Sequence, residues 1–180
     1  MKNGFLQLIE KGYGLLNKAG GGLKSPFLLA VRLYWGWQFA QSGWGKLHNL
    51  DHVTEFFTSL GIPMPHLNAI FIANLEFFGG LLLIVGLATR FIGLVLTCNM
   101  LVAYVTADRE ALTSIFSDPG KFYGADPYTF LFASLIALIF GGGVFSLDAL
   151  IARKVRARRT SETDSAQVRP ASSTMASARP

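Results

Sequence analysis

LEFFGGLLLIVGLATR, residues 75–90, is the stretch of this 180-residue chain that decides its fold. An apolar run contains one glutamate, Glu76, followed by the glycine pair Gly79 and Gly80, and it ends at Arg90 just before a second apolar run. A charged side chain at the centre of a bilayer costs about 2.5–3.5 kcal/mol. Glu76 therefore needs either partners on neighbouring helices or a function that offsets this cost.

Four apolar runs of roughly 17 to 23 residues follow one another, and a helix needs about 20 residues to span a bilayer. A span must form its backbone hydrogen bonds internally, so each run is expected to be a helix. Charged residues make up 15% of the chain, against about 25% in soluble domains. The sequence predicts an all-α membrane protein, a four-transmembrane-helix bundle with spans at residues 26–46, 67–89, 91–107 and 128–145.

Lysine and arginine are distributed unevenly around these runs. Twelve lie before the first run, at Arg90 or after the fourth run, whereas three lie in the other two loops. Because cytoplasmic loops carry the excess of basic residues, both termini are predicted to be cytoplasmic. The net charge of +5 is concentrated in the two tails, which favours a lipid surface as the partner and argues against nucleic acid.

The chain divides into three predicted parts. Residues 1–24 resemble an interfacial amphipathic helix that ends in a flexible glycine-rich link, and residues 25–151 contain the four spans. A short surface helix is expected near residues 56–60, and Ser146 is expected to cap a helix that leaves the membrane. Residues 152–180 are predicted to be a basic, disordered tail.

Polar residues inside the spans define a candidate pocket. Helical spacing places Glu76 on a glycine-bearing stripe, which is expected to face other helices because small residues permit close approach. At about 1.5 Å of rise per residue, Glu76 is level with two glutamines of the first span, and Arg32 is closer in level to Asn99. The candidate pocket residues are Arg32, Gln38, Gln41, Glu76 and Asn99.

Three further polar residues, Lys46, Arg90 and Asp148, are assigned to the membrane edge or to structural roles. Arg32 and Lys46 are the cations that could reach Glu76. Two interpretations of Glu76 stay open: a hydrogen-bonding clasp between helices, or a pocket for a lipid headgroup, a quinone or a proton.

No intrinsic cofactor or metal site is predicted. The single cysteine, Cys98, forms no intramolecular disulfide or redox pair. His48 and His52 have the i, i+4 spacing of two metal ligands, but no third ligand with close spacing stands out. The chain also has no glycine-rich loop of the kind that binds nucleotides.

Four segments in order resemble the DoxX family of small bacterial membrane proteins. They are Arg32 with residues 35–47 (WGWQFAQSGWGKL), residues 59–65 (SLGIPMP), residues 75–90 and residues 141–151 (GGGVFSLDALI). Gly142 stands where the family often has proline. The resemblance implies a four-helix bundle in the bacterial cytoplasmic (inner) membrane, connected to quinol-oxidising or thiosulfate:quinone oxidoreductase systems. The family's recurring polar positions fall on Arg32, Lys46, Glu76, Arg90 and Asp148.

The leading hypothesis is an accessory membrane subunit that accompanies a redox-protein partner, with a quinone as the candidate ligand of the polar pocket. One alternative is a structural or assembly subunit with no ligand, which could form a homo-oligomer. Another is a small transporter, although four spans show no inverted repeat.

Overall fold

The computed structural model describes the backbone of residues 2–167 and the side chains of residues 7–161. Every regular element within these residues is a helix, which confirms the predicted all-α class. The helices are α1 (Lys2–His48), α2 (Leu50–Ser59), α3 (Pro65–Val85), α4 (Thr89–Thr106), α5 (Arg109–Thr113), α6 (Pro119–Gly124), α7 (Pro127–Phe140) and α8 (Leu147–Gln167).

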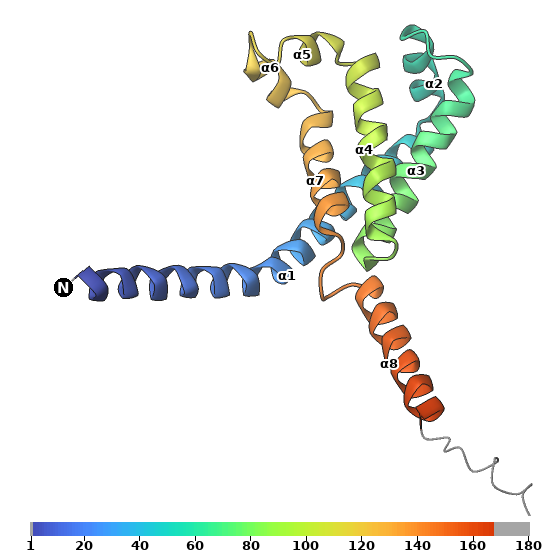
Figure 1. The fold of residues 1–180 in the computed structure, drawn as a ribbon. Helices are drawn as coiled ribbons and strands as arrows, with labels where there is room; N and C mark the ends of the chain where they lie inside the picture. The colour runs from blue at the N-terminus through green and yellow to red at the C-terminus, as the bar shows by residue number, and fades with distance from the viewer. Residues whose placement is uncertain (1, 168–180) are drawn as a thin grey trace, which may run out of the picture.

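The second half of α1 packs together with α3, α4 and α7 to form the body of the molecule (Figure 1). α1 packs mainly on α3 and α4 packs mainly on α7, and contacts of α3 with α4 and of α1 with α7 close the arrangement. Its core contains Phe39, Leu83, Leu96, Met100 and Tyr104. The four apolar runs of the sequence therefore share one core.

The outside of this body is apolar as well. α3 and α4 are long and apolar enough to cross a membrane, and α7 is apolar but shorter. Phe71, Phe78 and Phe91 on α3 and α4 are each more than half exposed. Large contiguous apolar surfaces of this kind are rare on soluble monomers and suit contact with lipid.

The turn between α3 and α4 differs from its predicted place. α3 ends at Val85, before the predicted end at residue 89, because Gly86 adopts a left-handed conformation with φ of 74°. Such a residue ends a helix by turning its N–H back to the last carbonyls, and Gly86 N–H reaches Leu82 O at 2.8 Å. α4 then begins at Thr89, so Arg90 lies in its first turn.

The end of α7 also differs from the prediction. α7 ends at Phe140, five residues before the predicted boundary, where Gly141 has φ of 71°. After an irregular stretch, Ser146 Oγ accepts a hydrogen bond from Ala149 N–H at 3.1 Å, which confirms Ser146 as an N-cap.

α8 continues to Gln167, although a disordered tail was predicted over residues 152–180. Most residues in this stretch favour helices, and neither glycine nor proline occurs between Ser146 and Pro170 to end one. The part of the predicted tail from residue 168 onward lies outside the described residues.

The predicted glycine-rich link is also part of a helix. Gly20 to Gly22 lie inside α1, which runs unbroken to His48. Glycine weakens a helix, but it keeps its N–H donor, so the hydrogen-bond ladder can continue. α1 bends between its projecting first part and the part in the bundle (Figure 1), and Pro26, which lacks an N–H, lies within it.

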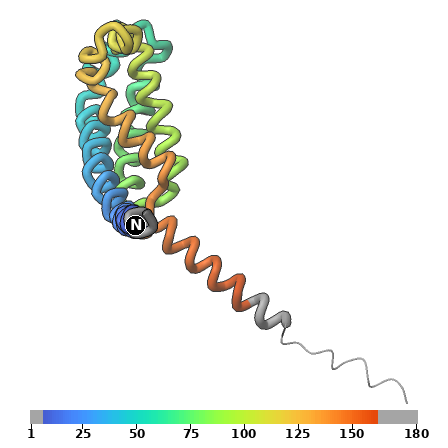
Figure 2. The backbone as a smooth tube through the Cα atoms, turned by 60° about the vertical axis from the view of Figure 1, so that its left-hand side comes forward, coloured from blue at the N-terminus to red at the C-terminus, as the bar shows by residue number. Residues whose placement is uncertain are grey.

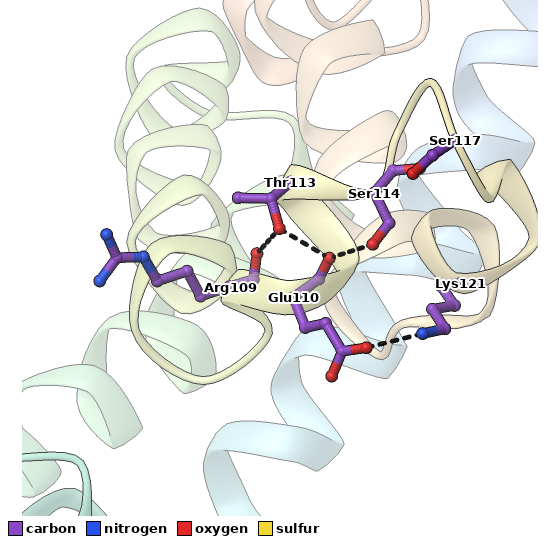
Figure 3. A network of polar contacts seen from close by, with 6 residues as sticks. All are labelled: Arg109, Glu110, Thr113, Ser114, Ser117 and Lys121. Carbon is purple, nitrogen blue, oxygen red and sulfur yellow. Dashed lines mark hydrogen bonds and ion pairs between the residues drawn. The ribbon is translucent and has the colours of Figure 1, made fainter.

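The helices outside the bundle lie at its two ends (Figures 1 and 2). The projecting part of α1 and α8 leave at one end, which we call the terminal end. The short helices α2, α5 and α6 lie at the opposite end, and α2 confirms the predicted short helix near residues 56–60. Figure 3 shows an exposed ion pair there, in which Lys121 Nζ lies 2.6 Å from Glu110 Oε1.

Candidate functional site

Glu76 is the centre of a buried polar cluster between α1, α3 and α4. It is 2% exposed. Its Oε2 accepts hydrogen bonds from Ser42 Oγ at 2.9 Å and from Lys46 Nζ at 2.5 Å. Its Oε1 accepts a hydrogen bond from Asn99 Nδ2 at 3.1 Å. These four residues, named the Glu76 cluster here, connect three helices and give partners to both carboxylate oxygens.

The direction of helical side chains explains why Lys46 reaches Glu76. α1 and α3 run antiparallel, since Gly36 lies against Gly80 while Gly43 lies against Ala73. Side chains on a helix lean toward its N-terminus. Lys46 on α1 and Glu76 on α3 therefore lean toward each other, although their backbones lie at different depths.

Glycines allow the backbones of α1 and α3 to touch. A Cβ atom added at Gly80 would lie 2.5 Å from Gly36 O, and one added at Gly43 would lie 2.6 Å from Ala73 O. The predicted glycine stripe on α3 therefore does face another helix. This close approach brings Ser42 within hydrogen-bond distance of Glu76.

Arg32 belongs to a separate site near the terminal end of the bundle. Its guanidinium donates hydrogen bonds to Leu83 O at 3.0 Å and to Ile84 O at 3.1 Å, at the C-terminus of α3. It also donates to Gly142 O and, at 3.1 Å, to Phe145 O in the α7–α8 connection. Four backbone carbonyls thus satisfy a guanidinium that is 2% exposed.

Arg32 and Glu76 are therefore not brought together. Leu83 is seven residues beyond Glu76 on α3, a separation of about 10 Å along the helix. Asn99, which the depth estimate placed nearer to Arg32, bonds instead to Glu76.

Asp148 links α8 to the turn between α3 and α4. Its carboxylate accepts hydrogen bonds from Ala88 N–H at 2.7 Å and from Thr89 N–H at 2.8 Å, which caps the N-terminus of α4. Burial raises the pKa of Asp148, but the hydrogen bonds from Thr89 and Ala88 and the charge of Arg32 outweigh burial, so the pKa lies below its ordinary value.

The other predicted site residues lie outside the Glu76 cluster. Gln38 is half-buried, Gln41 is exposed, and neither side chain forms a hydrogen bond within the described part of the chain. Arg90 is exposed and its guanidinium lies 3.4 Å from Ile139 O. Ser42 is the cluster member that the sequence analysis missed, although its i, i+4 spacing from Lys46 on α1 placed the two on one face.

The Glu76 cluster offers one group to an incoming ligand. The side chain of Lys46 is 30% exposed, whereas that of Glu76 is 2% exposed. An ammonium group has three N–H donors, and the structure records one hydrogen bond for Lys46 Nζ. The cluster can therefore donate hydrogen bonds to an acceptor from within an apolar bundle. Among the side chains that the structure describes, those of residues 7–161, no group of three or more histidine, cysteine, aspartate or glutamate residues could hold a metal ion.

Comparison with known proteins yields one family and one curated relative. Residues 27–109 match the model of the DoxX family. A protein of Bacillus subtilis (strain 168) named "Putative oxidoreductase CatD" is 28% identical over 123 residues, which cover 68% of this chain and 85% of that protein. No solved structure matches this chain. The family match contains Arg32 and all four residues of the Glu76 cluster.

Proposed function

We propose that this chain, whose residues 27–109 match the DoxX family model, is a multi-pass protein of the bacterial cytoplasmic membrane that serves a quinone-linked redox system. In this proposal α1, α3, α4 and α7 each cross the membrane, and both termini are cytoplasmic. The redox connection draws support from the Bacillus subtilis relative, which carries the word oxidoreductase in its name.

The hydrogen bonds of Arg32 support α7 as a membrane span. α7 has 14 residues, or about 21 Å, whereas the hydrocarbon core is about 30 Å thick. The irregular stretch after α7 would then lie at membrane depth, where unpaired backbone groups are costly. Arg32 bonds to Gly142 O and Phe145 O in that stretch, so it supplies partners that lipid cannot.

Cysteine labelling in cells tests this topology. With Cys98→Ser as background, Ser117→Cys in the outer loop is expected to react with a membrane-impermeant maleimide added to intact cells. Ala157→Cys on α8 is expected to react only after lysis. The reverse pattern, or equal labelling of both positions in intact cells, would contradict the orientation.

The spare donors of Lys46 carry the quinone proposal. A quinone presents carbonyl acceptors on an apolar ring with an apolar tail, so it needs hydrogen-bond donors within an apolar environment. Lys46 Nζ is held by a buried carboxylate, is partly exposed, and has donors left for a carbonyl oxygen. Glu76 would act as a positioning residue, because it fixes the ammonium group that contacts the quinone.

Titration of the purified protein with a short-chain quinone analogue, followed by tryptophan fluorescence, tests this proposal. We expect saturable binding that Lys46→Gln and Glu76→Gln each weaken by about tenfold or more, a loss of roughly 1.4 kcal/mol. Arg90→Gln is the matched control, because it also removes one charge near the membrane edge and should leave binding unchanged. The absence of saturable binding, or equal binding by all four proteins, would refute the quinone site.

A structural role for Glu76 is the second candidate. The observation that favours it is that both oxygens of Glu76 already have partners, which come from two other helices. In this role Glu76→Gln would lower stability and weaken co-purification of a redox partner in mild detergent, while quinone affinity would not change.

A further inference from the structure

An open groove of about 410 Å³ lies at the terminal end of the bundle. It is bordered by the part of α1 around Lys24, by the end of α7 with the stretch that follows, and by the first turns of α8. This groove is separate from the Glu76 cluster, none of whose residues lines it.

Three cations surround the groove: Lys24, Arg153 and Arg156. Lys24 Nζ lies 5.5 Å from the centre of the Phe140 ring. No aspartate or glutamate lines the groove. The ion pairs recorded among the described residues involve other lysines, so none of these three cations is neutralised by a carboxylate. An anion would complement this charge.

α8 supplies one wall of the groove through its periodicity. Ala149, Ala152, Arg153 and Arg156 all line the groove and recur at helical spacing, so they form one stripe of the helix. The alanines occupy little space beside the two guanidinium groups. Arginine is well suited to phosphate, because its planar fork donates two parallel hydrogen bonds to two oxygens.

The opposite side of the groove is apolar. Leu28, Phe140 and Val144 line it, and Phe140 and Val144 are each 48% exposed. Phe140 is the last residue of the apolar helix α7. The lining of the groove thus combines the apolar end of α7 with three cations. A free phosphate ion would use the cations and leave the exposed apolar wall without a partner.

We propose that this groove binds an anionic phospholipid, with the headgroup phosphate among Lys24, Arg153 and Arg156 and the start of an acyl chain against Phe140 and Val144. The inference rests on the proposed membrane insertion, but it is independent of the quinone site. The bound lipid would hold α8 against α1 at the membrane surface, where neighbouring anionic lipids also attract the basic α8.

Native mass spectrometry of the delipidated full-length protein tests the proposal. With added phosphatidylglycerol we expect one lipid bound with higher affinity than the rest, and no such site for phosphatidylcholine. The double variant Arg153→Gln/Arg156→Gln should weaken this site roughly tenfold or more, given the usual contribution of each basic residue at an anionic surface. The control variant Lys154→Gln/Arg158→Gln removes the same charge from the same helix outside the groove and should bind as the wild type does.

Two further measurements distinguish lipid binding in the groove from general electrostatic attraction to α8 and from binding of a phosphate group alone. Ala152→Trp fills the groove without removing a charge, and it should weaken phosphatidylglycerol binding. Glycerol 3-phosphate, which lacks acyl chains, should compete with the lipid only at far higher concentration. Three results would overturn the proposal: an equal loss of phosphatidylglycerol affinity in the two double variants, an unchanged affinity in Ala152→Trp, or competition by glycerol 3-phosphate at the same concentration as the lipid. A failed cysteine-labelling pattern would instead overturn the membrane topology, whatever lipid binds.

Discussion

Replacing Gly80 by alanine tests the contact that assembles the Glu76 cluster. A Cβ atom at this position would lie 2.5 Å from Gly36 O and 2.5 Å from Ala40 N, both backbone atoms of α1. Ordinary contacts of this kind are roughly 3.5 Å or longer. Because backbone atoms cannot rotate away, α1 and α3 must separate by about 1 Å to accept the methyl group.

The expected cost follows from this overlap. Overpacking a well-packed contact by one methyl group costs about 1–3 kcal/mol. Replacing glycine by alanine inside a helix also stabilises the helix by about 1 kcal/mol. The control must therefore be another glycine-to-alanine change inside a helix. Gly45→Ala on α1 provides it, because no atom lies within 4 Å of the added Cβ. Gly80→Ala should therefore be less stable than Gly45→Ala by about 1–3 kcal/mol.

Reversible unfolding in mixed detergent micelles, followed by far-ultraviolet circular dichroism, measures this difference. Gly79→Ala should lie between the two variants, since its added Cβ would meet a flexible Leu96 side chain at 3.3 Å. A separation of about 1 Å would also stretch the Ser42–Glu76 hydrogen bond beyond the usual limit of about 3.5 Å. If Gly80→Ala and Gly45→Ala were equally stable, the backbone contact between α1 and α3 would be refuted.

The remaining predictions concern single polar residues and use the same unfolding assay. Arg32→Lys should lower stability by about 2 kcal/mol, because a lysine ammonium has three N–H donors and cannot bond to all four carbonyls. Wild-type stability of this variant would exclude a role for Arg32 in tying α3 to the α7–α8 connection. Asp148→Asn should cost about 1 kcal/mol at neutral pH, because an amide has one acceptor oxygen and no charge, whereas the carboxylate accepts from both Ala88 N–H and Thr89 N–H. The pKa of Asp148 lies below its ordinary value, so Asp148 stabilises the fold fully above the ordinary pKa and loses this effect as pH falls through the lowered pKa. Asp148→Asn should therefore lose less stability in acid than the wild type does. Parallel stability curves of the two proteins in acid would contradict this role of Asp148. Lys121→Gln should not change stability, because the side chains of Lys121 and its partner Glu110 are both exposed; Figure 3 shows the pair. A clear loss of stability would show that the ion pair stabilises the connection between α4 and α7.

The all-helical fold followed directly from the sequence, since runs of apolar residues without alternation leave helix as the form that satisfies the backbone. The helix ends were less predictable. Gly86 and Gly141 each take a conformation with positive φ that ends a helix, but nothing in the hydropathy distinguishes them from glycines inside a helix such as Gly79. The predicted boundaries at residues 89 and 145 therefore fell several residues late.

The polar site was predicted in part. The glycine stripe correctly turned Glu76 toward other helices, and Asn99 was among the candidates. The depth estimate placed Arg32 closer in level to Asn99 than to Glu76, yet Asn99 bonds to Glu76, because the estimate compared Cα positions and ignored the direction of the side chains. Lys46 was assigned to the membrane edge but was also named as a cation that could reach Glu76, and its ammonium group does lie against Glu76.

Photolabelling with a quinone analogue would show whether a quinone binds at the Glu76 cluster. A photoreactive quinone would be added to the protein in lipid nanodiscs, and the labelled peptides would be identified by mass spectrometry. A quinone site at the Glu76 cluster predicts labels on the parts of α1 and α3 around Lys46 and Glu76, and their loss when excess unreactive quinone is added. Labels scattered over the exposed apolar side of α3, α4 and α7, unaffected by excess quinone, would contradict a quinone site at the Glu76 cluster.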